Sequence, residues 1–371
     1  MNVTFLIGNG FDRNLGLATT YAEFVKEYKT LESPSKTIED FRNYIKDNEE
    51  LWSSAEIALG QYTAQLDSGK GAAFSECHTD ICEELAKYLK DQQKRINYGI
   101  IPEKASEALI SLNAILQPFP TQENDTLNEV FTKHNHESRN FNFIIFNYTD
   151  TLDKLLEITQ KKQDILGAHK YSGQTLKHTV GRVCHVHGTV DGEMVFGVND
   201  DSQIAKNEVF ECEDGDLYKN LLIKQQANAT YLENTDAKAA KILSDSHLIY
   251  IYGMSIGETD KLWWNRICKW LKGSSERHLI VQKFSMPDKG VLPSKYQLAE
   301  RNARRDITRY CDLDEAAKRD IETRIHVTNH NIFEAIKEVA MSKEEQNKAY
   351  LTVLEQITAE EKTNKEALPM N

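Results

Sequence analysis

The first residues of the chain predict a buried strand that runs directly into a glycine turn. Val3 to Ile7 form an apolar run without a charge, and the turn Gly8-Asn9-Gly10 follows at once. Apolar residues on both faces are typical of a strand that is covered on both sides. Glycine has no Cβ, so backbone N–H groups of such a turn can approach a phosphate closely. Strand, glycine turn and helix predict the first βα unit of a dinucleotide-binding fold, although Arg13 stands where the third glycine of G-x-G-x-x-G belongs.

Later apolar runs alternate with helical patterns, which predicts further strands of the same sheet. The predicted strands span residues 141–146, 183–188, 194–198, 247–252, 278–284 and 324–328. Apolar residues at helical spacing predict helices at 151–158, across 203–243, at 296–310 and at 331–341. Strands that alternate with helices are typical of a parallel sheet covered on both faces. The predicted fold class is therefore α/β, a Rossmann-like parallel sheet with helices on both faces.

The stretch between the first two predicted strands has a different character. Residues 25–137 show helical patterns and no convincing strand. We therefore expect a helical insertion at 25–137, placed within a Rossmann-like α/β nucleotide-binding domain of residues 1–24 and 138–340. Residues 341–371 are rich in charge and predict a C-terminal helical tail.

The charge of the chain argues against a general nucleic-acid binder. Of 371 residues, 57 are Asp or Glu and 45 are Lys or Arg, which gives a net charge of −12 at pH 7. Binding to polyanions requires a basic surface, so nucleic acid is not an expected partner. No apolar run approaches the ~20 residues of a membrane-spanning helix, and we expect neither a membrane partner nor a signal peptide. The six cysteines include no C-x-x-C pair, so we expect reduced thiols and a cytoplasmic location.

Small, polar or ionisable residues follow five of the predicted strands. Ligands of a parallel sheet collect at the carboxyl ends of its strands. The five segments are Gly8 to Asp12, Asn147 to Asp150, His185 to Gly188, Gly197 to Asp200 and Gly253 to Asp260. A polar turn is ordinary after any single strand, but its repetition at five strand ends predicts a ligand site.

Asn147 and His187 are the candidate catalytic residues in these segments. A histidine with an ordinary pKa of about 6.5 suits a general base or a hydrogen-bond partner at neutral pH. A buried amide at the end of an apolar strand must find partners, so Asn147 could orient a water or a ribose hydroxyl. Its alternative role is to cap the helix that follows.

Other candidates have structural alternatives that the residues alone leave open. Asp12, Ser255 and Asp260 could each contact a ligand or cap a helix, and Glu56 could reach the pocket or lie at the surface. His185 lies two residues before the candidate catalytic histidine, and a pair at this spacing can ligate a metal. No third and fourth ligand stands beside them, so we expect no metal.

Six motifs in this order resemble the AbiH family of bacteriophage abortive-infection proteins. The motifs are Ile7 to Asp12, Gly16 to Tyr21, Trp52 to Glu56, Phe146 to Thr149, His185 to Gly188 and Tyr252 to Asp260. They extend over most of the chain, and the first and last are the most specific. This resemblance implies a role in antiviral defence by abortive infection.

The same order also resembles the wider sirtuin-like fold of NAD-binding proteins. That resemblance implies that Gly8 and Gly10 cradle the pyrophosphate, that Asn147 places an attacking water, and that His187 holds the ribose hydroxyls or acts as base. Further ligand contacts are expected from Asn9, Phe11, Asp12, Tyr148, Gly253, Ser255 and Asp260. The chain departs from the sirtuin-like pattern in three ways. Asp12 stands where that turn usually has serine, and the Asn-x-Asp motif is replaced by Asn147-Tyr148-Thr149. The four zinc cysteines are absent, which argues against protein deacylation.

The leading hypothesis is an antiviral effector that hydrolyses NAD, its substrate, to nicotinamide and ADP-ribose without a metal. The alternative keeps the fold and removes catalysis, leaving a nucleotide-sensing or protein-binding module of phage defence. A third hypothesis is a nuclease, for which Asp200, Asp201 and Asp260 would have to gather around Mg²⁺. The sequence leaves open the oligomeric state, the choice between NAD and a related nucleotide, and a phage or host protein as trigger.

Overall fold

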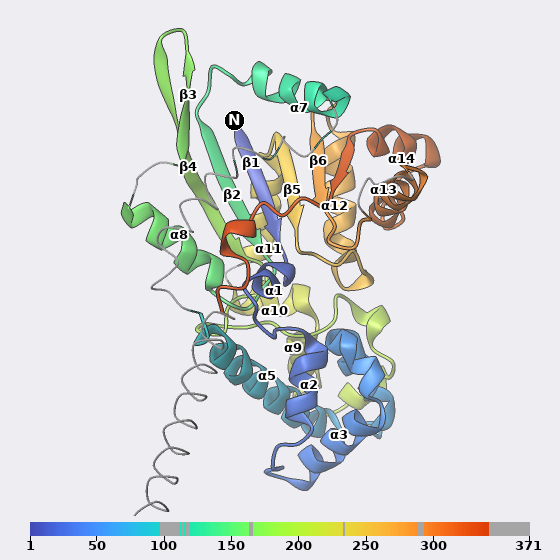
Figure 1. The fold of residues 1–371 in the computed structure, drawn as a ribbon. Coiled ribbons are helices and arrows are strands. Elements are labelled where there is room, and N and C mark those ends of the chain that lie inside the picture. The colour runs from blue at the N-terminus through green and yellow to red at the C-terminus, as the bar shows by residue number, and fades with distance from the viewer. Residues whose placement is uncertain are drawn as a thin grey trace, which may run out of the picture.

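The computed structural model describes residues 1–96, 121–162, 166–232, 234–287 and 293–340, together with Leu112, Ile115 and Phe119. Its centre is a seven-stranded sheet in the order β3-β4-β2-β1-β5-β6-β7 (Figure 1). The strands are β1 Asn2–Ile7, β2 Arg139–Ile145, β3 Gly167–Tyr171, β4 Gln174–His185, β5 Leu248–Tyr252, β6 His278–Gln282 and β7 Ile325–Thr328. All neighbours are parallel except β3 and β4, which form an antiparallel hairpin. The prediction of an α/β fold with a mostly parallel sheet is confirmed.

The first strand lies in the middle of the sheet because it is apolar on both faces. Phe5 is paired with Phe143 of β2 on one side and with Tyr250 of β5 on the other. The rings of Phe5 and Phe143 stack with their centroids 5.4 Å apart. Val3, Phe5 and Ile7 contribute to the core on one face of the sheet, whereas Leu6 contributes to the core on the other. This alternation is the two-residue period of a strand that is covered on both sides.

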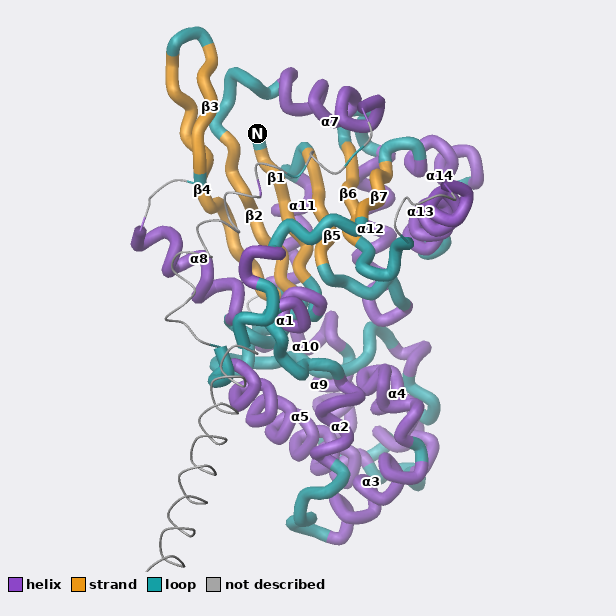
Figure 2. Tube along the Cα trace, viewed as in Figure 1, coloured by secondary structure: helices purple, strands orange, loops and turns teal. Residues whose placement is uncertain are grey.

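Helices cover each face of the sheet and also its carboxyl end. One face packs against α7 Thr121–Lys133 and α8 Thr151–Lys162, and the other against α11 Thr235–Ser244, α12 Lys261–Lys272 and α13 Pro293–Thr308. A second group of helices lies beyond the carboxyl ends of the strands, as Figures 1 and 2 show. It contains α2 Tyr21–Tyr28, α3 Lys36–Asp47, α4 Ala55–Tyr62, α5 Gly71–Gln93, α9 Gly215–Leu222 and α10 Lys224–Tyr231.

This second group has a hydrophobic core of its own, which includes Phe24, Phe41, Trp52 and Phe74. Its first helix begins with a capping box, in which the Thr20 hydroxyl and the Glu23 carboxylate each bond the other's backbone N–H. Helices α3, α4, α5 and α7 fall within the predicted insertion, whereas α1 Gly10–Asn14 and the start of α2 precede it, and the division of the chain into domains stays a prediction. The predicted tail, residues 341–371, lies outside the described residues, as does part of 25–137.

Three predicted elements are wrong or incomplete. Residues 194–198 form no strand but only two isolated bridges, Gly188 to Met194 and Val198 to Ile223, because this apolar segment packs against the second group of helices. The strand predicted at 183–188 is the end of β4, which begins at Gln174 and pairs with the unpredicted β3. Instead of a helix at 331–341, the described residues there contain a single 3₁₀ turn, η7 Glu334–Ile336, and α14 Glu315–Glu322 was not predicted.

Two of the six cysteines form a disulfide, whereas we expected reduced thiols. Cys268 of α12 and Cys311, which follows α13, form a disulfide with their Cα atoms 6.0 Å apart. The other four cysteines are free, as expected. Among the helices that the structure describes, none combines the length and apolar character needed to cross a membrane.

Candidate functional site

A pocket of about 410 Å³ lies where β1, β2 and β5 end and the second group of helices begins. We call it the strand-end pocket. It is lined by every predicted site residue except Phe11, namely Gly8, Asn9, Gly10, Asp12, Asn147, Tyr148, His187, Gly253, Ser255 and Asp260. Phe11 instead points into the core, where its ring meets Phe333 edge-on at 5.0 Å. Four of the five predicted strand-end segments therefore share one cavity, whereas no residue from Gly197 to Asp200 lines it.

The glycines of the first turn bring two turns of the backbone together. Gly8 N–H donates to the Tyr252 carbonyl at 2.9 Å, and Gly10 N–H donates to the Gly253 carbonyl at 2.7 Å. A Cβ on Gly10 would lie only 2.4 Å from the Gly253 Cα, and Gly253 itself has a φ of +66°. The absence of side chains is thus required by the contact between the β1 and β5 turns. Both N–H groups therefore donate to carbonyl groups of the protein itself, whereas the sequence predicts that they bind a phosphate.

Asp12 lies beneath the pocket on the short helix α1 Gly10–Asn14 and is almost fully buried. Its two carboxylate oxygens accept hydrogen bonds of 2.6 Å from the hydroxyls of Thr149 and Thr151. Burial raises the pKa of Asp12 to about 6, while the two threonines and the Asn147 amide act to lower it. The alternative of a plain helix cap does not describe Asp12, because its carboxylate joins α1 to the start of α8.

Asn147 and His187 each present a buried polar atom that lacks a partner. Asn147 follows β2 and His187 follows β4, and both residues are 7% exposed. Within the described part of the chain, neither Asn147 Oδ1 nor His187 Nδ1 has a hydrogen-bond partner. Buried polar atoms are nearly always paired in folded proteins, so two such atoms on residues that line one cavity point to a place where a ligand or water can complete the bonding.

His187 is held as a neutral imidazole. Burial lowers the pKa of His187 well below its usual range, and the nearby Lys224 charge lowers it further. The ring packs edge-on against Phe146 with centroids 5.8 Å apart. His187 is consequently a hydrogen-bond partner at neutral pH and a weaker base than the ordinary pKa of histidine suggested.

Asp260 stands beside this histidine at the end of the β5 turn. Asp260 Oδ1 lies 4.0 Å from His187 Nε2. Burial raises the pKa of Asp260 to about 6, Lys224 lowers it, and Glu56 raises it. Ser255, in the same turn, is exposed at the rim.

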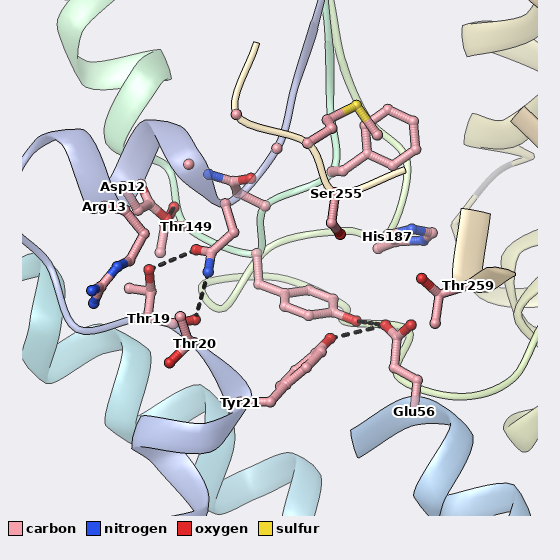
Figure 3. Close-up of a pocket in the computed structure, with 18 of the residues that line it drawn as sticks. Asp12, Arg13, Thr19, Thr20, Tyr21, Glu56, Thr149, His187, Ser255 and Thr259 are labelled. Carbon is pink, nitrogen blue, oxygen red and sulfur yellow. Dashed lines mark hydrogen bonds between the residues drawn. The ribbon is translucent and has the colours of Figure 1, made fainter. Parts of the chain in front are cut away.

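The far wall of the strand-end pocket is a buried polar cluster around Glu56 of α4. Lys224 Nζ of α10 donates to Glu56 Oε2 at 2.7 Å. The hydroxyls of Tyr21 and Tyr148 donate to Glu56 Oε1 at 2.9 and 3.2 Å. Figure 3 shows Glu56, Thr259 and His187 on one side of the pocket and Asp12, Arg13 and Thr19 on the other. Glu56 therefore reaches the pocket, and Lys224 is a pocket residue that the sequence did not single out.

The Arg13 side is held by local contacts. Arg13 Nη1 donates to both carboxylate oxygens of Glu23, at 2.6 and 2.8 Å. The Asn9 amide exchanges two hydrogen bonds with Thr19, donating to its carbonyl at 3.0 Å and accepting from its hydroxyl at 2.6 Å. Asn9 thereby fastens the glycine turn to the segment that leads into α2.

His185 lies apart from the pocket. Its Nε2 is 2.8 Å from Asp153 Oδ2, and its Nδ1 is 3.2 Å from the Asn147 carbonyl. In the described ranges, no group of three or more His, Cys, Asp or Glu side chains is placed to hold a metal ion. Asp200 and Asp201 pair with Lys261 and Lys219, so the carboxylates of the nuclease hypothesis do not gather.

The family model described as Bacteriophage abortive infection AbiH matches residues 4–282. The match spans all residues that line the strand-end pocket, most of β1, and the whole of β2 to β6. A comparison with curated proteins finds no match.

Proposed function

This chain belongs to the AbiH family of bacteriophage abortive-infection proteins, and we propose that it defends by hydrolysing NAD in the strand-end pocket. The products would be nicotinamide and ADP-ribose. The observation that carries the proposal is the pair of unpartnered buried atoms, Asn147 Oδ1 and His187 Nδ1, in one cavity at the strand ends.

The order of the strands supports this proposal. Leaving aside β3, the order β4-β2-β1-β5-β6-β7 reverses direction at β1, and the pocket lies at the carboxyl end of that strand. Parallel sheets of the Rossmann-like type bind nucleotides at such a reversal. The sirtuin-like resemblance enters the proposal for a related reason. An asparagine follows β2 and a histidine follows β4, next to this reversal of the strand order.

Asn147 is suited to place the attacking water. The side-chain amide N–H of Asn147 bonds to the Asp12 carboxylate and lowers its pKa. The amide oxygen, Oδ1, is left as an acceptor without a partner. Thr149 and Thr151 fix Asp12 from its other side. A water that donates to Asn147 Oδ1 would be held in a fixed place, which reduces the entropy lost when it reacts.

His187 is suited to hold a ribose hydroxyl. With the proton on Nε2, which faces Asp260, the unpartnered Nδ1 accepts a hydrogen bond. The neutral imidazole that burial enforces is the form that can accept. Hydroxyl groups of a ribose are donors of the required kind.

The reaction does not require a strong nucleophile, so water can serve. The bond between C1′ and the nicotinamide nitrogen breaks with its electron pair passing to that nitrogen, which becomes neutral. Water oxygen bonds to C1′, and one proton is released to solvent. Positive charge develops on the ribose on the way, so positioning and electrostatic stabilisation supply most of the rate.

Purified protein incubated with NAD tests the proposal, with free nicotinamide measured by chromatography. We expect release by the parent, and a loss of about a hundredfold or more in Asn147→Ala and in His187→Ala. Variant Glu258→Gln, which alters an exposed side chain outside the pocket, serves as control and should match the parent. No release by the parent at any enzyme concentration, with or without lysate of infected cells, would contradict hydrolysis.

A second candidate function is a nucleotide sensor or protein-binding module without catalysis. The observation that favours it is the engagement of the Gly8 and Gly10 N–H groups within the protein, which removes two donors from a phosphate cradle. Binding of NAD or ADP-ribose without turnover, abolished by Asn147→Ala, would support this alternative.

A further inference from the structure

The strand-end pocket contains three buried carboxylates, and only one lacks a hydrogen-bond donor. Asp12 accepts from two threonine hydroxyls, and Glu56 accepts from Lys224 and two tyrosine hydroxyls. Among the described residues, no donor lies within hydrogen-bond distance of the Asp260 carboxylate, and Nε2 of the neutral His187 lies 4.0 Å from its Oδ1. Asp260 is also largely buried, with a side chain 17% exposed.

An ionised carboxylate in this position attracts a cation or a hydrogen-bond donor. Burying a carboxylate without a partner is costly, so proteins keep such groups where a ligand completes them. None of the three basic side chains around the pocket is available as a cationic partner for Asp260. Lys224 is paired with Glu56, Arg13 is paired with Glu23 on the opposite side, and His187 is neutral.

We infer that Asp260 faces the cationic centre of the ligand and stabilises the positive charge that spreads onto the ribose as the glycosidic bond breaks. This inference rests on the proposed function. It specifies the substrate class as N-ribosides whose base carries a positive charge, such as the oxidised nicotinamide nucleotide, and it makes Asp260 a catalytic residue beside Asn147 and His187.

The other groups around this point agree with that assignment. His187 Nδ1 and the Asp260 carboxylate are both acceptors, so this side of the pocket suits hydroxyl donors and positive charge. It does not suit a phosphate, which would face Asp260 and Glu56. In a low-dielectric cavity a fixed carboxylate acts strongly on charge that develops nearby.

Asp260→Asn tests the inference because it removes the charge and keeps the shape. We expect kcat for nicotinamide release to fall about a hundredfold, with a smaller change in KM, since the charge acts mainly on the transition state. Asp260→Glu, which keeps a carboxylate, should recover part of the rate. Glu258→Gln removes a charge from an exposed side chain two residues away and should leave kcat unchanged.

The pH dependence distinguishes a catalytic charge from a structural role. The parent rate should decline as the pH falls through about 6, because protonation removes the Asp260 charge. Asp260→Asn should show a weaker decline, because Asp12, whose pKa is also about 6, remains in the variant. A pH profile of kcat that is the same in the parent and in the folded variant, or an unchanged kcat, would overturn the assignment.

A binding measurement keeps failure of this inference distinct from failure of the proposed function. By calorimetry, the parent should bind NAD more tightly than NADH, whose nicotinamide ring is neutral, and Asp260→Asn should narrow that difference. If the parent releases no nicotinamide but shows this preference, hydrolysis is contradicted and recognition of the cationic base by Asp260 is supported. Equal affinities for NAD and NADH in the parent, or binding of neither, would overturn the inference.

Discussion

Two buried aspartates of the pocket differ in what surrounds their carboxyl groups. Asp12 is bonded to Thr149 and Thr151 and is enclosed by protein, which makes it a support for neighbouring groups. Asp260 has no such donors and faces the cavity. Burial nevertheless raises the pKa of each to about 6, because both carboxylates lose water when the chain folds.

This raised pKa predicts a pH-dependent penalty on folding. The folded-state pKa of Asp260 is about 6, whereas its usual value is 3.8, so the folded protein binds the extra proton between these values. The stability that Asp260 contributes is present below pH 3.8 and is lost as the pH rises through about 6. Asp260→Asn, which cannot ionise, should therefore gain stability relative to the parent between pH 4 and pH 7.5, on the order of 3 kcal/mol.

Urea unfolding of both proteins at the two pH values measures this gain. Contributions of other groups, such as His187, are largely common to both proteins and cancel. Glu258→Gln should show no comparable change. An equal stability difference between parent and Asp260→Asn at both pH values would show that the pKa of Asp260 is not raised by folding.

At the same scale, the sequence predicted residues whose signal is local and missed those whose partners are distant. Gly8, Gly10, Asn147 and His187 each lie within three residues of the end of a strand, after a short apolar run, so their place at the strand ends could be predicted. The ion pair of Glu56 with Lys224 joins residues 168 positions apart, and neither carries a local pattern that points to the other. The hydrogen bonds that the N–H groups of Gly8 and Gly10 donate likewise depend on a distant partner, the β5 turn.

Among the elements, α4 and α10 are joined across the pocket by the buried pair of Glu56 and Lys224. Both side chains are less than a tenth exposed, and two tyrosine hydroxyls complete the bonding of the carboxylate. Removing one partner of a buried pair leaves an uncompensated charge. The pair therefore affects the free energy of unfolding mainly through the stability that is lost when one of its two partners is removed.

Lys224→Met should destabilise the protein by about 3–5 kcal/mol, because Glu56 is left buried without its cation. Glu56→Gln with Lys224→Met should lose less than the two single changes together, since neither charge remains. Chemical denaturation of the four proteins gives the coupling energy. Lys36→Met, at an exposed lysine of α3, is the matched control and should unfold near the parent's midpoint. Additive losses in the cycle would show that the pair does not hold these helices together.

The predictable elements were those with a strong apolar period. β1, β2, β5, β6 and β7 are buried from end to end or nearly so, and each was predicted close to its observed position. β3 and the first part of β4 are mostly exposed and polar, so the hairpin lacks the apolar signal of a strand. Residues 194–198 carry that signal for another reason, since Phe196 and Val198 are buried by helices.

For the whole molecule, the position of the second group of helices decides what kind of site this sheet has. These helices lie over the carboxyl ends of the strands (Figure 1), and residues of the helices and of the strand ends together line the strand-end pocket. Three of its walls come from segments far apart in sequence, around Glu56, Asn147 and Lys224.

Membership in the AbiH family places the chain in phage defence by abortive infection, and hydrolysis of NAD would account for the arrest of the infected cell. The most direct test is the NAD content of cells that carry the parent or His187→Ala, followed after phage challenge at equal protein levels. We expect NAD to fall before lysis in cells with the parent and to stay constant with His187→Ala, which should also lose protection. Protection by the parent without a fall in NAD would contradict hydrolysis in the strand-end pocket and leave the non-catalytic alternative.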